Sequence, residues 1–136
     1  MKVENAVHPD PANIKPFIET DGPVCMVNLL KFREKAAYPD GRDPELSGRE
    51  AYLRYGRAMV KLVEATGGRF IFAAEVKGLL LGEVEELWDE VGIVEYPSSK
   101  ALIEIASTPE FREIEVHREA GLAGQLNLTT SERSAL

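Results

Sequence analysis

The chain is 136 residues long, 44% hydrophobic and 29% charged, which is the composition of an ordinary folded globular domain. Its formal net charge of -7 and pI near 4.9 argue against binding to nucleic acid or to an anionic membrane surface, because such binding needs lysines and arginines clustered on one face. There is no apolar signal segment at the N-terminus and no apolar run as long as a bilayer span, so the sequence predicts a cytoplasmic protein.

The two ends of the chain differ from its middle. Residues 1–22 contain prolines and alternate polar with apolar positions irregularly, which predicts an N-terminal arm with one short helical turn after Asp10-Pro11. Residues 131–136 predict a frayed C-terminal tail. A single domain is therefore expected over residues 23–130.

The first strand is predicted from Val24 to Phe32, and it is apolar on both alternating faces as far as Leu30. A strand of this kind is buried on both sides. Cys25 within it is expected to act as a small hydrophobic residue and not as a reactive thiol. Asn28 in its middle points into dry surroundings, where an unpaired amide costs roughly 1 to 3 kcal/mol.

A long helix follows an irregular excursion. Residues 38–44 are dense in turn formers and predict an excursion at the edge of the sheet. Ser47 and Glu50 form a capping box, which predicts the start of a helix, and Gly67-Gly68 predicts its end. Apolar and aromatic side chains recur between them at helical spacing: Tyr52, Tyr55, Met59, Leu62 and Val63.

Two further strands are expected in the middle of the chain. Arg69 to Leu81 is rich in Phe, Ile, Val and Leu and predicts the second strand. Glu83 to Glu86 predicts a charged hairpin connection. Leu87 to Tyr96 predicts the third strand, which begins near Trp88 and ends before Pro97.

Two helical segments and a strand complete the domain. Ser98 and Ser99 predict a cap for a helix over Lys100 to Ala106. Thr108 before Pro109 predicts a second helix that extends toward Gly121. Leu122 to Thr130 alternates apolar with polar side chains and predicts the last strand.

The predicted order is β-α-β-β-α-β, a ferredoxin-like α+β fold with an antiparallel four-stranded sheet and both helical segments on one face. The opposite face carries apolar side chains as well, and an apolar sheet face of this size left in water is an association site. We therefore expect a homodimer that packs the two sheets face to face.

Several segments resemble one bacterial family, the domain of unknown function 1330. They are Pro23 to Phe32, Trp88 to Val91, Val94 to Ser98 and His117 to Leu122, and the likeness spans roughly Pro23 to Thr130. The family resembles the dimeric α+β barrel superfamily, which implies pockets between sheet and helices. Relatives there include cofactor-independent monooxygenases, haem-handling enzymes, dehydratases and structural dimers, so the resemblance implies a fold more than an activity.

The adjacent residues His117 and Arg118 are the strongest chemical pair. A histidine exchanges protons near neutral pH, and an arginine holds a carboxylate with two hydrogen bonds. The alternative is structural: both lie near a helix C-terminus, and Glu113 stands four residues before His117 as an ordinary ion-pair partner. A metal site on Glu113 and His117 is not expected, because no third ligand has useful spacing.

Four other residues are candidates for the same site. Asn28 could orient a ligand carbonyl, or could instead bond the neighbouring backbone or a water. Tyr52 and Tyr55 could donate protons to a ligand, and Trp88 could form a pocket wall. Residues in such positions are more often part of the core, or for Trp88 of a dimer contact. Gly56 in mid-helix indicates close approach by backbone or ligand.

Two functions are compatible with these residues. The first is a cofactor-independent enzyme, monooxygenase-like or isomerase-like, that acts on a small carboxylate-bearing or aromatic metabolite. His117 would then move a proton with help from Tyr52 or Tyr55, while Arg118, Asn28 and Trp88 bind the substrate. The second is a non-catalytic homodimer that binds a small molecule or has a structural role. Neither hypothesis requires a metal or a cofactor.

Overall fold

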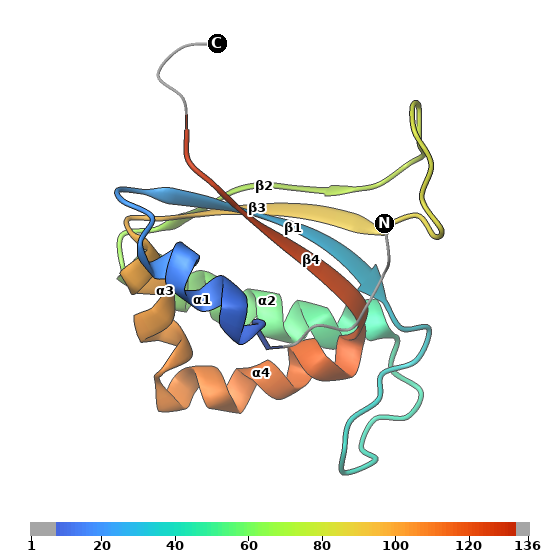
Figure 1. Cartoon of the computed structure of the whole chain (residues 1–136). Helices are drawn as coiled ribbons and strands as arrows, with labels where there is room; N and C mark the ends of the chain where they lie inside the picture. The colour runs from blue at the N-terminus through green and yellow to red at the C-terminus, as the bar shows by residue number, and fades with distance from the viewer. Residues whose placement is uncertain (1–7, 133–136) are drawn as a thin grey trace.

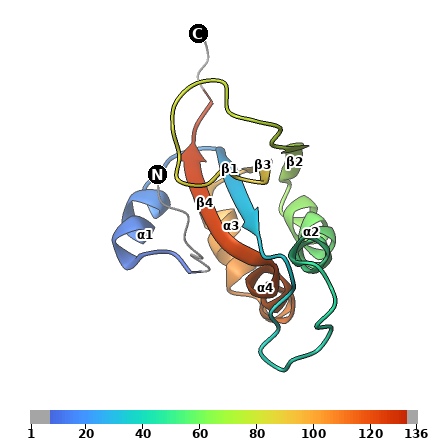
Figure 2. The same cartoon turned by 90° about the vertical axis from the view of Figure 1, so that its right-hand side faces the viewer.

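A computed structural model describes residues 8–132 of the chain. Its elements follow in the order α1 (Pro11–Ile18), β1 (Val24–Phe32), α2 (Gly48–Ala65), β2 (Arg69–Glu75), β3 (Glu90–Tyr96), α3 (Ser99–Ala106), α4 (Pro109–Gly121) and β4 (Leu122–Thr130). The strands form one antiparallel sheet in the order β2-β3-β1-β4, and α2, α3 and α4 cover one of its faces (Figures 1 and 2). The predicted ferredoxin-like α+β fold is confirmed.

The predicted caps set the helix starts. The Ser47 hydroxyl accepts a hydrogen bond from the Glu50 backbone N–H at 3.1 Å, and the Glu50 carboxylate accepts one from the Ser47 N–H at 3.1 Å. Thr108 caps α4 in the same way through the backbone N–H of Phe111, and Ser98 caps α3. Each cap satisfies backbone donors that a helix end leaves without an internal partner.

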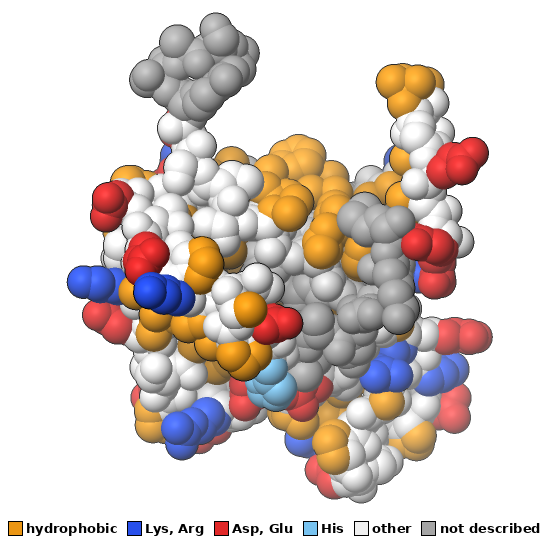
Figure 3. Space-filling model, in the orientation of Figure 1, with side chains coloured by type: hydrophobic (Ala, Val, Ile, Leu, Met, Phe, Trp, Pro, Cys, Tyr) orange, Lys and Arg blue, Asp and Glu red, His pale blue; other side chains and the backbone are white. Residues whose placement is uncertain are grey.

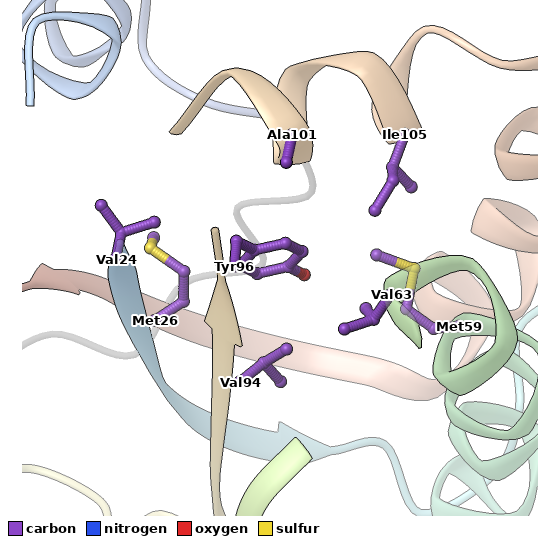
Figure 4. Close-up of a cluster of buried hydrophobic side chains, with 8 residues drawn as sticks. All are labelled: Val24, Met26, Met59, Val63, Val94, Tyr96, Ala101 and Ile105. Carbon is purple, nitrogen blue, oxygen red and sulfur yellow. The ribbon is translucent and has the colours of Figure 1, made fainter. Parts of the chain in front are cut away.

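The core lies between the helices and one face of the sheet (Figure 4). Alternate residues of β1 and β3 supply the sheet side, and one stripe of α2 and of α3 supplies the helix side. Its buried members are Val24, Met26, Met59, Val63, Val94, Tyr96, Ala101 and Ile105. Even-numbered residues of β1 and β3 therefore face the helices.

The opposite face carries two apolar rows that run across all four strands. The strand register places Leu128, Val27, Ile93 and Phe72 in one row, and Leu126, Leu29, Val91 and Ala74 in the next. Polar rows flank them, with an Arg69–Glu95 ion pair at 3.0 Å on one side and Lys31 beside Asp89 on the other. Figure 3 shows hydrophobic side chains gathered over this part of the sheet. We call the two apolar rows the open face.

The segment between β2 and β3 differs from the prediction. β2 ends at Glu75 instead of Leu81, and β3 begins at Glu90 instead of Leu87. The intervening loop, residues 76–89, rises on the side of the open face (Figures 1 and 2). Leu80 and Leu81 are 94% and 83% exposed. Their composition predicted a strand, but the pairing of β2 with β3 ends at Glu75, so these leucines have no strand beside them.

The N-terminal arm is more ordered than one turn. Asp10 caps α1, which has eight residues and carries Phe17 against the core. The Ser99 hydroxyl donates to the backbone carbonyl of Ile18 at 3.2 Å, which ties α1 to α3. The remainder of the predicted arm, residues 1–7, and of the predicted tail, residues 133–136, lies outside the described residues.

Candidate functional site

Asn28 lies on the sheet face that is covered by the helices. It stands between Met26 and Leu30, which are both buried on that face, and it is itself half-buried. Its cross-strand neighbours are Gly92 on β3 and Asn127 on β4. The polar side chain therefore interrupts the core at the centre of the sheet and does not lie on the open face.

Three side chains form a continuous hydrogen-bonded chain, which we call the polar relay. The Arg118 guanidinium on α4 donates to Gln125 Oε1 on β4 at 2.6 Å. Gln125 Nε2 donates to Asn28 Oδ1 at 3.0 Å. Asn28 Nδ2 then donates to the backbone carbonyls of Met26 at 3.4 Å and Gly92 at 3.3 Å. The relay thus connects a helix, an edge strand and the centre of the sheet.

Tyr52 and Tyr55 on α2 lie near the relay. Their rings pack at 5.5 Å between centroids, and Phe32 and Phe111 continue the aromatic contacts on either side. Burial raises the pKa of Tyr52 and of Tyr55, and the nearby charge of Arg118 partly opposes the rise. Both phenols are therefore protonated donors at neutral pH, and within residues 8–132 neither hydroxyl has a hydrogen-bond partner.

Two glycines, one on α2 and one on the sheet, leave room where other residues would carry a Cβ atom. Gly56 precedes buried Met59 by three residues and buried Val63 by seven, so it lies on the inner side of α2. Gly92 precedes buried Val94 by two residues and lies on the helix-covered face of β3. A Cβ atom added at either glycine would meet no atom within 4 Å. Among residues 8–132 no backbone from another element approaches Gly56, so of the two expected causes, backbone or ligand, only the ligand stays a prediction.

Glu90 is a candidate that sequence reasoning missed. It is paired with Leu30 across β1 and β3 and lies on the same face as Gly92. Burial raises the pKa of the Glu90 carboxyl, and the Arg49 guanidinium, 3.1 Å away, opposes the rise. Its signal in the sequence was the position four residues before Val94, which strand alternation assigns to the same face.

Gln125 is the other missed residue, and a signal for it existed. It begins the alternating series of polar residues in the last strand, Gln125, Asn127 and Thr129. The strand order and register bring this series beside Asn28, and both depend on the assembled sheet. The sequence alone could assign Gln125 to a face but not to a partner.

His117 belongs to a different set of contacts from Arg118. Its Nδ1 lies 2.7 Å from the Tyr38 hydroxyl, which also accepts a hydrogen bond from Arg54 at 3.2 Å. Burial lowers the pKa of His117, and the charges of Arg42 and Arg54 lower it further. The expected ion pair with Glu113 is not formed within the described chain.

Trp88 lies in the loop before β3 and not at the start of a strand. It is 5% exposed, and its buried indole N–H has no acceptor among the described residues. No aromatic contact places it with Tyr52 or Tyr55 in the part of the chain described. Its role as a pocket wall stays a prediction.

The walls of two surface hollows contain no relay residue, although Asn127, the β4 neighbour of Asn28, lines the second. One, of about 320 Å³, is lined by Cys25 and by the carboxylates of Asp21, Glu95 and Glu132, which repel an acidic ligand. Burial and the charge of Glu95 raise the pKa of the Cys25 thiol, so this cysteine is not a thiolate at neutral pH. The other, of about 350 Å³, lies between α1 and the end of β4.

Residues 8–132 lack two further features. They contain no cluster of three or more histidine, cysteine or acidic side chains suited to a metal ion. No helix within them has the length and apolarity needed to cross a bilayer.

The fold and the relay define a ferredoxin-like α+β protein with a polar site between its sheet and its helices. The chain belongs to the family described as domain of unknown function (DUF1330), whose model matches residues 43–130. No curated protein matches this chain.

Solved structures agree with this assignment. RPA0582, a protein of unknown function from Rhodopseudomonas palustris, is 32% identical over 96% of this chain and 98% of its own, with a TM-score of 0.85. SnoaB, a cofactor-independent oxygenase from Streptomyces nogalater, is 15% identical over 85% of this chain and 98% of its own, with a TM-score of 0.53. At that identity, the second likeness supports the fold alone.

Proposed function

We propose that this protein binds a small carboxylate-bearing or aromatic metabolite in the space between α2 and the sheet. The observation that carries the proposal is the polar relay beside the open space at Gly56 and Gly92. Arg118 supplies a positive charge there, in a chain whose net charge is -7. The rings of Tyr52 and Tyr55 supply apolar surface and two protonated donors. This combination of apolar wall and few polar groups is typical of small-molecule sites.

Replacing Arg118 tests the proposal with benzoate as the probe. Arg118→Ala is expected to weaken benzoate binding about tenfold or more, because a charge-assisted hydrogen bond contributes roughly 1.5 to 3 kcal/mol. Isothermal titration calorimetry measures the affinity. Arg112→Ala is the matched control, since Arg112 is an exposed arginine on the same helix. Equal benzoate affinity in both variants and the wild-type protein would exclude Arg118 as the anchor.

A second candidate is a cofactor-independent enzyme built on the same site. Glu90 favours it, because a half-buried carboxyl with a raised pKa beside protonated tyrosines can exchange protons with a ligand. The resemblance to SnoaB in fold is compatible with such chemistry. NMR spectra of benzoate incubated with the protein distinguish the two candidate functions. A binding protein leaves the benzoate unchanged, whereas an enzyme converts it.

We also propose that two copies pack through the open face. The two apolar rows flanked by polar rows have the layout of an interface core and its rim. The loop with Leu80 and Leu81 rises from the same side, where a second sheet about 10 Å away would lie against it. Glu83, Glu85 and Glu86 in this loop disfavour an anionic membrane as the partner. A second copy of the chain covers both features at once.

A single charge on the open face tests the dimer. Leu128→Glu is expected to convert a micromolar dimer into monomer, because the carboxylate would be buried without a partner. Sedimentation velocity measures the change. The control is Leu53→Glu, which places the same charge on the outer side of α2 at nearly equal exposure, 42% against 45% for Leu128. A wild-type monomer, or equal behaviour of the two variants, contradicts this interface.

A further inference from the structure

The polar relay has one possible direction. An arginine side chain can only donate, so Arg118 must meet the oxygen of Gln125 and not its nitrogen. The Gln125 amide nitrogen is thereby turned toward Asn28, which accepts through Oδ1. At the other end, the carbonyls of Met26 and Gly92 can only accept, so they face Asn28 Nδ2. A donor at one end and acceptors at the other fix both amides.

This direction determines what Asn28 can offer to a ligand. Its two amide hydrogens face two backbone carbonyls, whereas Oδ1 has two lone pairs and accepts from Gln125 with one. Asn28 therefore has an acceptor remaining and no donor. The sequence-based expectation that Asn28 orients a ligand carbonyl requires a donor, and this hydrogen bonding does not supply one.

The Asn28 side chain lies next to the room at Gly92, with Nδ2 on the side of Gly92 and Oδ1 on the side of Gln125. Gly92 is the direct cross-strand neighbour of Asn28, and a Cβ atom at Gly92 would have no atom within 4 Å. Gly56 leaves similar room on the helix side. A ligand that occupies this room and extends across the Asn28 amide toward Gln125 meets the remaining lone pair of Oδ1.

We propose that Asn28 selects ligands that carry a hydroxyl or N–H donor in addition to their acid group, such as hydroxylated aromatic acids. This inference rests on the proposed binding of a carboxylate at Arg118. A ligand with a carbonyl at that position would place its oxygen against Asn28 Oδ1, and two acceptors repel each other. A buried polar site strongly disfavours a ligand that leaves its hydrogen-bonding group unpaired.

Matched benzoates test the inference in the wild-type protein. The probes are 3- and 4-hydroxybenzoate, the methylbenzoates of nearly equal size that lack a donor, and the formylbenzoates that present only an acceptor. At least one hydroxybenzoate is expected to bind about tenfold or more tightly than its methyl and formyl counterparts. Titration calorimetry gives the affinities.

Asn28→Leu then assigns the preference to this residue. The variant is expected to lose the advantage of the hydroxybenzoate over its methyl counterpart, which is measured as the ratio of the two affinities within the variant. If the variant does not fold, the comparison in the wild-type protein still decides. Formylbenzoates that bind more tightly than hydroxybenzoates, or a hydroxyl preference that persists in Asn28→Leu, would overturn the inference and leave carboxylate binding intact. If no benzoate binds, the proposed function fails and the inference fails with it.

Discussion

Asn28→Asp is expected to lower the free energy of unfolding by about 2 to 4 kcal/mol at pH 7, even though the two side chains have nearly the same shape. One oxygen of the carboxylate can still accept a hydrogen bond from Gln125. The other would take the position of Nδ2 and lie 3.4 Å and 3.3 Å from the carbonyl oxygens of Met26 and Gly92. Two donated hydrogen bonds become repulsive contacts in a half-buried position. Urea denaturation measures the loss.

The loss should depend on pH in a definite direction. Burial and the two carbonyl oxygens favour the protonated acid, so the pKa of Asp at position 28 is raised in the folded state above the unfolded value of about 3.9. The folded state then binds more protons than the unfolded state, and stability falls as the pH rises. Relative to the wild-type protein, the variant should be less destabilised at pH 5 than at pH 8.

Asn127→Asp is the matched control. Asn127 is the β4 neighbour of Asn28 on the same face, but it is exposed. The same substitution there should change stability by about 0.5 kcal/mol or less. An Asn28→Asp variant as stable as Asn127→Asp at every pH would mean that Asn28 Nδ2 does not face the backbone carbonyls.

Features with local causes could be predicted from the sequence. The bounds of β1 and β4, the capping box of Ser47 and Glu50, and the Thr108 cap depend on residues within a few positions of each other. The alternation of apolar and polar residues in the strands and the helix caps therefore predicted the order of the elements, and that order predicted the fold. Tyr52 and Arg118 were also identified as candidates from their chemistry and their positions on helices.

The partners of those candidates could not be predicted in the same way. His117 and Arg118 are adjacent in the sequence, but successive residues of a helix point about 100° apart. One therefore meets Tyr38 in the excursion and the other meets Gln125 on β4. The second contact depends on the register between strands, which the sequence does not state.

The prediction for the segment between β2 and β3 was wrong for a related reason. Leu79, Leu80 and Leu81 have the composition of a strand, and the predicted strand continued through them. A strand needs a neighbour of equal length, and β3 pairs with β2 only as far as Glu75. Their exposure in one copy of the chain is the reason why the second copy enters the proposal.

Gly48→Ala is expected to destabilise the protein by about 3 kcal/mol, although alanine favours helices. A Cβ atom at Gly48 would overlap the Arg33 carbonyl oxygen and stand 2.6 Å from that of Gly121. Both oxygens are held by the backbone, since the Arg33 N–H donates to Gly121 and the Gly48 N–H donates to Arg33. The end of β1 and the facing ends of α2 and α4 would have to separate. Thermal or urea unfolding measures the effect.

Gly56→Ala provides the matched comparison on the same helix. With no atom within 4 Å of its added Cβ, the substitution should stabilise α2 by about 0.5 to 1 kcal/mol. The same methyl group would occupy part of the open space beside the relay, so benzoate binding should weaken while stability rises. Gain of stability with loss of binding is the behaviour of a glycine retained for a ligand. If Gly56→Ala instead destabilised the fold as much as Gly48→Ala, the space between α2 and the sheet would not exist.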